Sequence, residues 1–184
     1  SREDDFADLE LSVPSSPTSL AECLKACFAP EVLEGDNAVY CDSCGKRCPT
    51  TKQCIVDVFP PVLSLHLKRF SFDPVTFRQS KIATPVSIPF SLSIRDIVEG
   101  TPTHGSGGTY ELTAVLMHSG TASSGHYFAL VRGESGSWLL CNDASISPVT
   151  SDAVAAMLQP VLQTDDLAPA ATGGVDTGIP MPAP

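Results

Sequence analysis

Two residues with complementary chemistry stand at the ends of two strand-like runs. His126 follows the turn residues Ser-Ser-Gly and begins a run to Arg132, and Asn142 ends a run that starts at Trp138. The run from His126 alternates with the period of a strand, so its histidine lies at a rim. If the two strands pair as a hairpin, the imidazole and the carboxamide can meet. Together they would supply a general base and its orienting partner, two of the three parts of a nucleophilic site.

A structural role is the alternative for the same residues. A histidine at a strand end is commonly solvated or hydrogen-bonded, and Asn142-Asp143 is a pair that often forms turns. Short patterns of this kind have a real rate of false matches. Taken alone, the spacing therefore leaves both the catalytic and the structural interpretation open.

The net charge of the chain limits the classes of binding partner that we expect. The 184 residues carry a net charge of −10, and acidic residues are dense from Arg2 to Glu10. Nucleic acid and anionic membranes repel such a chain, so we expect neither as a partner. A partner that presents basic groups suits it better. The length is that of one large domain or two small ones.

The cysteines indicate a reducing compartment and a metal site. There are seven of them, with no signal peptide and no long apolar span, which favours a cytoplasmic or nuclear protein. Cys41 and Cys44 form a C-x-x-C pair followed by Gly45, the pattern of a zinc knuckle. Zinc needs four ligands, and Cys48 and Cys54 do not form a second such pair. Either the partner pair lies outside this chain or the two cysteines are a structural remnant; a redox role is weaker because no helix start follows.

Alternation and capping signals predict the elements that position these residues. Ser19 and Glu22 form a capping box for a helix that ends near Phe28. Cys23 and Cys27 lie four residues apart on the apolar stripe of this helix, and we expect them to pack and not to bind metal. Strands are predicted over residues 5–13, 52–59 and 62–70, with a hairpin turn at residues 73–76.

The remaining segments carry weaker signals. Residues 100–109 are predicted to be a flexible loop, and Ser151 is predicted to cap a short helix that ends at Gln159. Residues 168–184 consist mostly of proline, glycine and alanine, without a basic or aromatic residue. Such a composition cannot bury enough apolar surface to order itself, so we expect a disordered tail.

In its motifs the chain resembles the ubiquitin-specific proteases, the large papain-like class of deubiquitinases. The resemblance spans about residues 6–149, and the order and spacing of its segments make it specific. The matching segments are Leu63-x-Leu65-His66-Leu67-Lys68-Arg69-Phe70, Tyr40-Cys41-x-x-Cys44-Gly45-Lys46, Lys81-Ile82, Tyr110-x-Leu112-x-Ala114-Val115-Leu116-x-His118-x-Gly120, Gly125-His126-Tyr127, and Trp138 with Asn142-Asp143.

The resemblance implies an α+β chain with the papain-like cysteine protease fold of the ubiquitin-specific protease type. Residues 1–61 would form the fingers and their base with half a zinc ribbon, and residues 62–150 the palm. Residues 151–184 would hold the short helix and the tail. The chain would thus supply the β-rich palm and fingers, with the thumb absent.

The resemblance also implies a role for each candidate residue. His126 would be the general base that ionises a cysteine, Asn142 its orienting partner, and Asp143 an assisting residue. Residues 119–125 would form a loop over the cleft that admits the Gly-Gly tail of ubiquitin. The candidate residues for binding the substrate are His118, Ser119, Gly125 and Tyr127. Cys41 and Cys44 would be half of a four-cysteine structural zinc site.

Departures from the family pattern affect the expected activity. The nucleophilic cysteine of the family lies far upstream, and none of the seven cysteines here has its context; the first zinc pair and an aromatic closing strand are also absent. We therefore expect part of a deubiquitinase, or one piece of a split gene product, that is inactive by itself. Its partners would be ubiquitin and ubiquitinated proteins. The alternative is a non-catalytic ubiquitin-binding or scaffolding module.

Overall fold

The computed structural model describes residues 3–97 and 108–159 of the chain. The helices are α1 (Leu20–Phe28) and α2 (Ser151–Leu158), and a 3-10 turn covers Gly35–Asn37. The strands are β1 (Leu9–Ser12), β2 (Thr18–Ser19), β3 (Glu31–Leu33), β4 (Val39–Cys41), β5 (Lys46–Cys48), β6 (Thr50–Lys52), β7 (Leu65–Lys68), β8 (Phe70–Asp73), β9 (Arg78–Lys81), β10 (Val86–Ser87), β11 (Ser91–Ser93), β12 (Thr109–Glu111), β13 (Ala114–Gly120), β14 (Gly125–Arg132), β15 (Trp138–Asn142) and β16 (Ser145–Val149).

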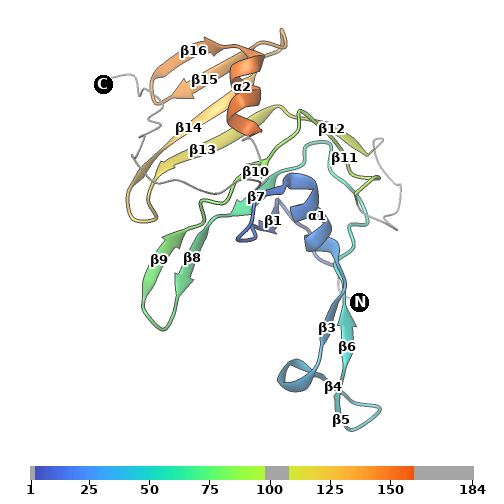
Figure 1. Cartoon of the computed structure of the whole chain (residues 1–184). Coiled ribbons are helices and arrows are strands. Elements are labelled where there is room, and N and C mark those ends of the chain that lie inside the picture. The colour runs from blue at the N-terminus through green and yellow to red at the C-terminus, as the bar shows by residue number, and fades with distance from the viewer. Residues whose placement is uncertain (1–2, 98–107, 160–184) are drawn as a thin grey trace, which may run out of the picture.

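Three parts of the molecule are distinct in Figure 1. An antiparallel sheet of order β13-β14-β15-β16 lies at one end, with α2 against it. A long arm, built from the pairs β3–β6 and β4–β5, extends from the opposite end. Between them α1 lies beside the parallel pair β1–β7, and the hairpin β8–β9 projects from this central part.

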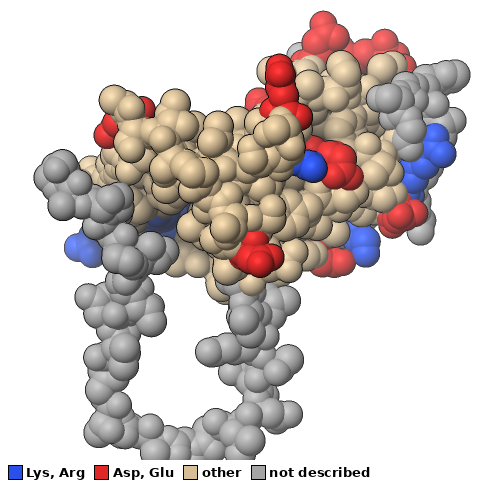
Figure 2. All heavy atoms as spheres, turned by 90° about the horizontal axis from the view of Figure 1, so that it is seen from above, with Lys and Arg blue, Asp and Glu red and all other residues tan. Residues whose placement is uncertain are grey.

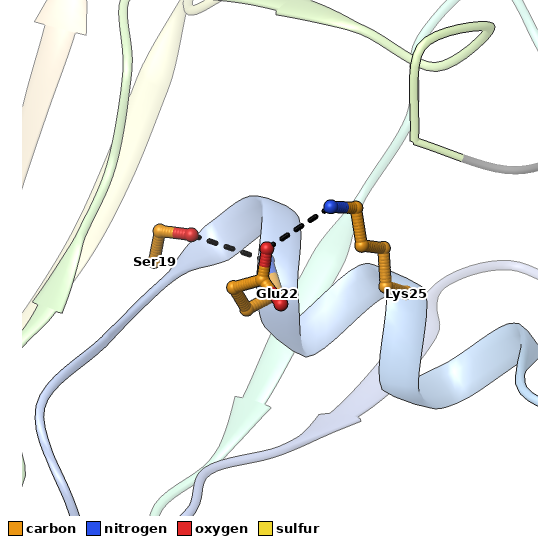
Figure 3. Close-up of polar contacts among 3 residues, drawn as sticks. All are labelled: Ser19, Glu22 and Lys25. Carbon is orange, nitrogen blue, oxygen red and sulfur yellow. Dashed lines mark hydrogen bonds and ion pairs between the residues drawn. The ribbon is translucent and has the colours of Figure 1, made fainter.

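Helix α1 begins as its sequence predicts. The hydroxyl of Ser19 accepts a hydrogen bond from the amide of Glu22 at 3.2 Å, and the carboxylate of Glu22 binds the ammonium of Lys25 at 3.1 Å (Figure 3). The apolar stripe of the helix enters the first core, where Cys23 is 2% exposed. Cys27 packs at the edge of this core. The prediction that both thiols pack is therefore confirmed, and burial raises the pKa of each.

The first core forms where α1 covers the parallel pair β1–β7. Leu9 pairs with Leu65 and Leu11 with Leu67, so the apolar side chains of both strands share one face. The polar residues between them face outward, with Lys68 3.2 Å from Glu10. The alternation read from the sequence is confirmed. The β8–β9 hairpin begins directly after β7, so this core anchors the start of the hairpin.

The second core joins α2 to the sheet that carries the candidate residues. Leu130 of β14 and Trp138 of β15 are buried together with Val154 and Leu158 of α2. Side chains alternate along a strand, so His126, four residues before Leu130, lies on this same face at the end of the strand. The packed core thereby fixes the strands on which His126 and Asn142 stand.

Two predictions are wrong. Of the strand expected at residues 52–59, only Lys52 belongs to a strand, as the last residue of β6, which pairs with β3 as far as Lys52 opposite Glu31. The next pairing position would be Pro30, which has no amide proton to donate, so the ladder ends there. The hydroxyl that caps α2 belongs to Thr150, which accepts from the amide of Ala153 at 3.2 Å, and Ser151 is already helical.

Nothing in the sequence pattern predicted β16. It closes the sheet by pairing with β15, although it contains no aromatic residue, and Leu139 lies opposite Pro148. A proline is tolerated there because β16 is an edge strand of the described sheet. Most of the loop predicted at residues 100–109 and the whole tail predicted at 168–184 lie outside the described residues.

The described surface has few concentrated charges on the face shown in Figure 2. Uncharged residues make up most of this face, and acidic side chains are scattered over it. Across residues 3–97 and 108–159, neither helix is long and apolar enough to cross a membrane.

Candidate active site

The imidazole of His126 and the carboxamide of Asn142 meet at the rim of the β13–β16 sheet. The Nε2 atom of His126 lies 2.5 Å from Oδ1 of Asn142. His126 is the second residue of β14 and Asn142 the last residue of β15, and the two strands are antiparallel neighbours. The hairpin proposed from the sequence therefore forms, and it brings the two side chains together as expected.

This contact determines which nitrogen of His126 is protonated. The Oδ1 atom of Asn142 is a carbonyl oxygen and can only accept, so Nε2 of His126 must donate. In the neutral imidazole the lone pair is then on Nδ1. The His126 side chain is 36% exposed, so this second nitrogen lies on an accessible ring. The arrangement provides an oriented base that can take a proton at Nδ1.

Asp143 lies close to the same ring but outside hydrogen-bond range. Its Oδ2 atom is 3.8 Å from Nε2 of His126, and its side chain is 81% exposed. Asp143 also has a positive φ of 49° at the turn between β15 and β16, a conformation in which aspartate is enriched. At this distance and exposure the carboxylate makes no direct hydrogen bond to the ring.

The predicted substrate-binding residues divide between the two faces of β13–β14. Ser119 pairs with His126, and His118 pairs with Tyr127. Residues directly opposite each other in a ladder share a face, and successive residues face opposite sides. Ser119 therefore lies on the face of His126, whereas His118 and Tyr127 lie on the other.

A pocket of about 490 Å³ opens on the face of His118 and Tyr127. One wall is the β8–β9 hairpin and the other is the turn between β13 and β14. The lining residues are Phe70, Ser71, Phe72, Gln79, His118, Thr121, Ala122, Ser123, Ser124, Gly125 and Tyr127. Three of the four predicted binding residues line this pocket, and Ser119 does not.

His118 is held tightly in the pocket wall. Its ring centroid lies 5.3 Å from that of Phe70 and 4.6 Å from that of Tyr127. Burial lowers the pKa of His118, and the nearby charge of Lys81 lowers it further. The Nδ1 atom is buried without a hydrogen-bond partner among the described residues. A Cβ at Gly125 would overlap the ring of His118, which is why glycine stands there.

The sequence interpretation missed one wall of the pocket. Phe70, Phe72 and Gln79 come from the β8–β9 hairpin, which was predicted only as a hairpin. A signal was present, since Phe70 and Phe72 alternate with the polar residues Ser71 and Asp73 along β8. Exposed aromatic side chains in such a position indicate a binding surface.

None of the seven cysteines, all of which lie in the described ranges, hydrogen-bonds to His126. Cys141 is nearest in sequence to the site, but it pairs with Ala129 and lies on the opposite face of β15 from Asn142. Cys23 and Cys27 belong to the first core. In the described residues, therefore, no cysteine thiol is hydrogen-bonded to the imidazole that Asn142 orients.

Cys41 and Cys44 lie in the β4–β5 hairpin, at the end of the arm in Figure 1. The amides of Cys44 and Gly45 donate to the carbonyl of Cys41 at 3.2 and 2.9 Å, and Gly45 has a φ of +64°. The Cys44 amide also faces the sulfur of Cys41 and lowers the pKa of that thiol. The Cys44 thiol donates to the sulfurs of Cys41 and Cys48, and these bonds hold its proton and raise the pKa of Cys44. Within the described ranges no cluster of three or more metal-binding side chains forms, and the structure does not test the predicted zinc site.

Comparison with known proteins assigns the chain. The family model "Ubiquitin carboxyl-terminal hydrolase" matches residues 24–167. The chain belongs to the ubiquitin carboxyl-terminal hydrolase family. The described site residues, His126, Asn142 and the pocket wall, all lie inside the matched region.

Similar relatives come from animals and plants. The chain is 36% identical over 155 residues to ubiquitin carboxyl-terminal hydrolase 21 of Mus musculus. The match covers 82% of this chain and 26% of that protein. It is 36% identical over 149 residues to hydrolase 26 of Oryza sativa subsp. japonica, covering 80% of this chain and 13% of the relative. The chain therefore spans about a quarter or less of the length of these two relatives.

Solved structures confirm the fold. The SAGA Ubp8/Sgf11/Sus1/Sgf73 DUB module bound to ubiquitin aldehyde matches with a TM-score of 0.68 and 28% identity, covering 81% of this chain and 33% of that one. A structure of the yeast SAGA DUB module matches with a TM-score of 0.70 and 29% identity, covering 81% and 32%. The resemblance to ubiquitin-specific proteases and the expected α+β, papain-like fold of that type are thus confirmed.

Proposed function

We propose that this chain carries the general base and the orienting residue of a ubiquitin-specific thiol hydrolase. The observation that supports this most strongly is the 2.5 Å contact between His126 Nε2 and Asn142 Oδ1. It leaves Nδ1 of His126 free to accept a proton, and it occurs in a chain of the ubiquitin carboxyl-terminal hydrolase family.

The proposed reaction proceeds through a thioester. Nδ1 of His126 takes the proton of a cysteine thiol, and the thiolate attacks the carbonyl carbon of the C-terminal glycine of ubiquitin. The C–N bond breaks, and His126 returns the proton to the leaving amine. Water then attacks the thioester, with His126 again as the base, and releases ubiquitin and the thiol. Asn142 keeps the ring oriented in every step, and Asp143 lies beside the ring as an assisting residue.

The thiol in this proposal comes from outside the chain. None of the seven cysteines hydrogen-bonds to His126, and Cys141 lies on the opposite face of its strand. A base without a thiol in hydrogen-bond reach cannot form the thioester. The chain alone is accordingly proposed to be inactive. "Complete enzyme" below means the chain together with the segment that supplies the thiol.

Ubiquitin and ubiquitinated proteins are the proposed partners. The pocket beside the β13–β14 turn has aromatic walls and polar side chains from the turn, which suit an extended peptide. A structural relative was solved with ubiquitin aldehyde bound, which supports this choice of partner. The net charge of −10 favours a basic peptide.

Zinc is the proposed structural metal of the arm. Cys41 and Cys44 fit half of a tetrahedral thiolate site, because Gly45 closes the knuckle and an amide already stabilises the Cys41 thiolate. Two further ligands would come from outside the chain. The bound metal would hold the arm rigid and take no part in the reaction.

A ubiquitin probe that reacts with an active-site thiol tests the function. We expect a covalent adduct on the complete enzyme, on a cysteine outside this chain, and none on residues 1–184 alone, as measured by intact mass. An adduct on one of the chain's own cysteines would make that residue the nucleophile. If the complete enzyme binds ubiquitin but forms no adduct and shows no hydrolysis, the non-catalytic binding module is favoured.

A further inference from the structure

One side chain joins the two walls of the pocket. The ammonium of Lys81, at the end of β9, donates to the carbonyl of His118 at 2.9 Å and to that of Gly120 at 3.0 Å. These acceptors are 37 and 39 residues away in the sequence, at the end of β13. The contact therefore links the β8–β9 hairpin to the strand that enters the β13–β14 turn.

The acceptors suit an ammonium group. In the described sheet β13 is an outer strand, so its outward carbonyls have no neighbouring strand to pair with. Carbonyls two residues apart along a strand point to the same side, which lets one ammonium bind both. Such charge-assisted hydrogen bonds are stronger than those between neutral groups.

The base of the hairpin is itself fixed. The amide of Ile82 donates to the carbonyl of Arg69 at 2.7 Å, and the guanidinium of Arg69 donates to the carbonyls of Ile82 and Thr84 at 3.0 and 2.7 Å. Lys81 lies directly opposite Phe70, whose ring contacts His118. Lys81 and Phe70 form one cross-strand pair of the anchored hairpin. Lys81 thus contacts the backbone of His118, and Phe70 contacts its ring.

The β13 residues that Lys81 binds lie next to the β13–β14 turn and close to His126 in the sheet. Gly120 precedes the turn in which the amide of Thr121 donates to the carbonyl of Ser124 at 2.8 Å. Ser119, between the two bound carbonyls, pairs with His126. An ammonium that binds the carbonyls of His118 and Gly120 consequently holds the end of β13 from which the turn begins.

We propose that Lys81 is a positioning residue that holds the β8–β9 hairpin and the β13–β14 turn together, so that the pocket is formed before ubiquitin binds. The inference rests on the proposed function. Less conformational entropy is then lost when ubiquitin binds, because the two walls are ordered in advance. The His126–Asn142 contact depends on β14 and β15, which Lys81 does not touch, so its loss should affect binding of the substrate more than the chemical step.

The test compares Lys81→Met and Lys81→Arg in the complete enzyme, with Lys68→Met as a matched control. Lys68 forms an exposed ion pair with Glu10, so its loss should change little. For a ubiquitin C-terminal ester, we expect Lys81→Met to raise KM about tenfold and to change kcat by less than about twofold. Lys81→Arg should stay within about threefold of the unmodified enzyme, because it keeps a cationic donor.

Hydrogen exchange provides a readout that needs no activity. In Lys81→Met the amides of Thr121 and Ser124 should exchange faster, and in Lys81→Arg and Lys68→Met they should not. Unchanged exchange in Lys81→Met overturns the inference whatever the kinetics show, and faster exchange with unchanged KM overturns its role in binding. If the unmodified enzyme hydrolyses no ubiquitin ester, the proposed function fails, and the exchange still decides whether Lys81 holds the turn. Should Lys81→Met not fold, Lys81→Gln replaces it with the same expected direction.

Discussion

His126 and Asn142 touch although they are not opposite each other in the sheet. The paired stretch of β14 and β15 ends at Ala129 and Cys141, and Asn142 lies one residue beyond it while His126 lies three residues beyond on its own strand. The 2.5 Å contact is therefore a diagonal one, made by two side chains on the same face. A diagonal pair at the end of a ladder leaves the other edge of the imidazole open to a partner from outside the sheet.

Replacement of the base gives the first prediction. His126→Ala in the complete enzyme should lower kcat for a ubiquitin ester about 10²–10⁴-fold, the usual loss when a general base is removed. Affinity for ubiquitin should stay within a few-fold, since His126 does not line the pocket. Steady-state kinetics and calorimetry measure the two effects. Near-normal hydrolysis by His126→Ala would show that His126 is not the base.

The orienting residues should rank by distance. Asn142→Ala should cost less than His126→Ala, because water or Asp143 can partly replace the carboxamide. Asp143→Ala should cost less again, about twofold or less, because its carboxylate is 3.8 Å away and 81% exposed. The measurement is kcat for the three variants under the same conditions. A larger loss in Asp143→Ala than in Asn142→Ala would reverse the assignment of the orienting residue.

Zinc content tests the knuckle. The complete enzyme should contain one zinc, which Cys41→Ala combined with Cys44→Ala should remove. Cys54→Ala is the matched control, because Cys54 is an exposed free thiol outside the knuckle. Residues 1–184 alone should bind zinc poorly, since two thiolates leave half of the coordination sphere to water. Metal analysis decides the matter, and stoichiometric zinc that survives the double replacement would exclude this site.

His118 should make stability depend on pH. Its pKa is lowered in the folded protein, first by burial and then by Lys81, whereas in the unfolded chain it is about 6.5. Below that value the unfolded chain binds more protons, so stability is full at higher pH and falls as the pH drops through 6.5 toward the folded pKa. Urea unfolding of the complete enzyme between pH 5 and 8 measures this. The pH dependence should be weaker in His118→Gln; an equally steep dependence would contradict the lowered pKa.

The cap of α2 provides a matched pair of variants. Thr150→Ala removes the hydroxyl that accepts from the Ala153 amide, and it should lower the free energy of unfolding by about 1 kcal/mol. Ser151→Ala should change it by less than about 0.5 kcal/mol, because Ser151 is the first helical residue. Urea denaturation of both variants compares the two hydroxyls. A larger effect of Ser151→Ala would favour the cap expected from the sequence.

The sequence by itself determined the side-chain alternation of several strands, the start of the first helix and the pairing of His126 with Asn142. The alternation around Leu65 and around His126 shows which residues share a face, because the period of two is a local property of an extended chain. The cap at Ser19 is equally local, since a hydroxyl and an amide three residues apart make it. The positions of His126 and Asn142 at strand ends were sufficient to predict that they would meet.

Only the tertiary structure decided which face of the sheet meets which part of the chain. Periodicity separates His118 from His126, but the pocket beside His118 exists because the β8–β9 hairpin, far upstream in the sequence, lies against the β13–β14 turn. The link through Lys81 depends on the same approach. Contacts between distant segments are set by how the two cores pack, and no local pattern in the sequence contains that information.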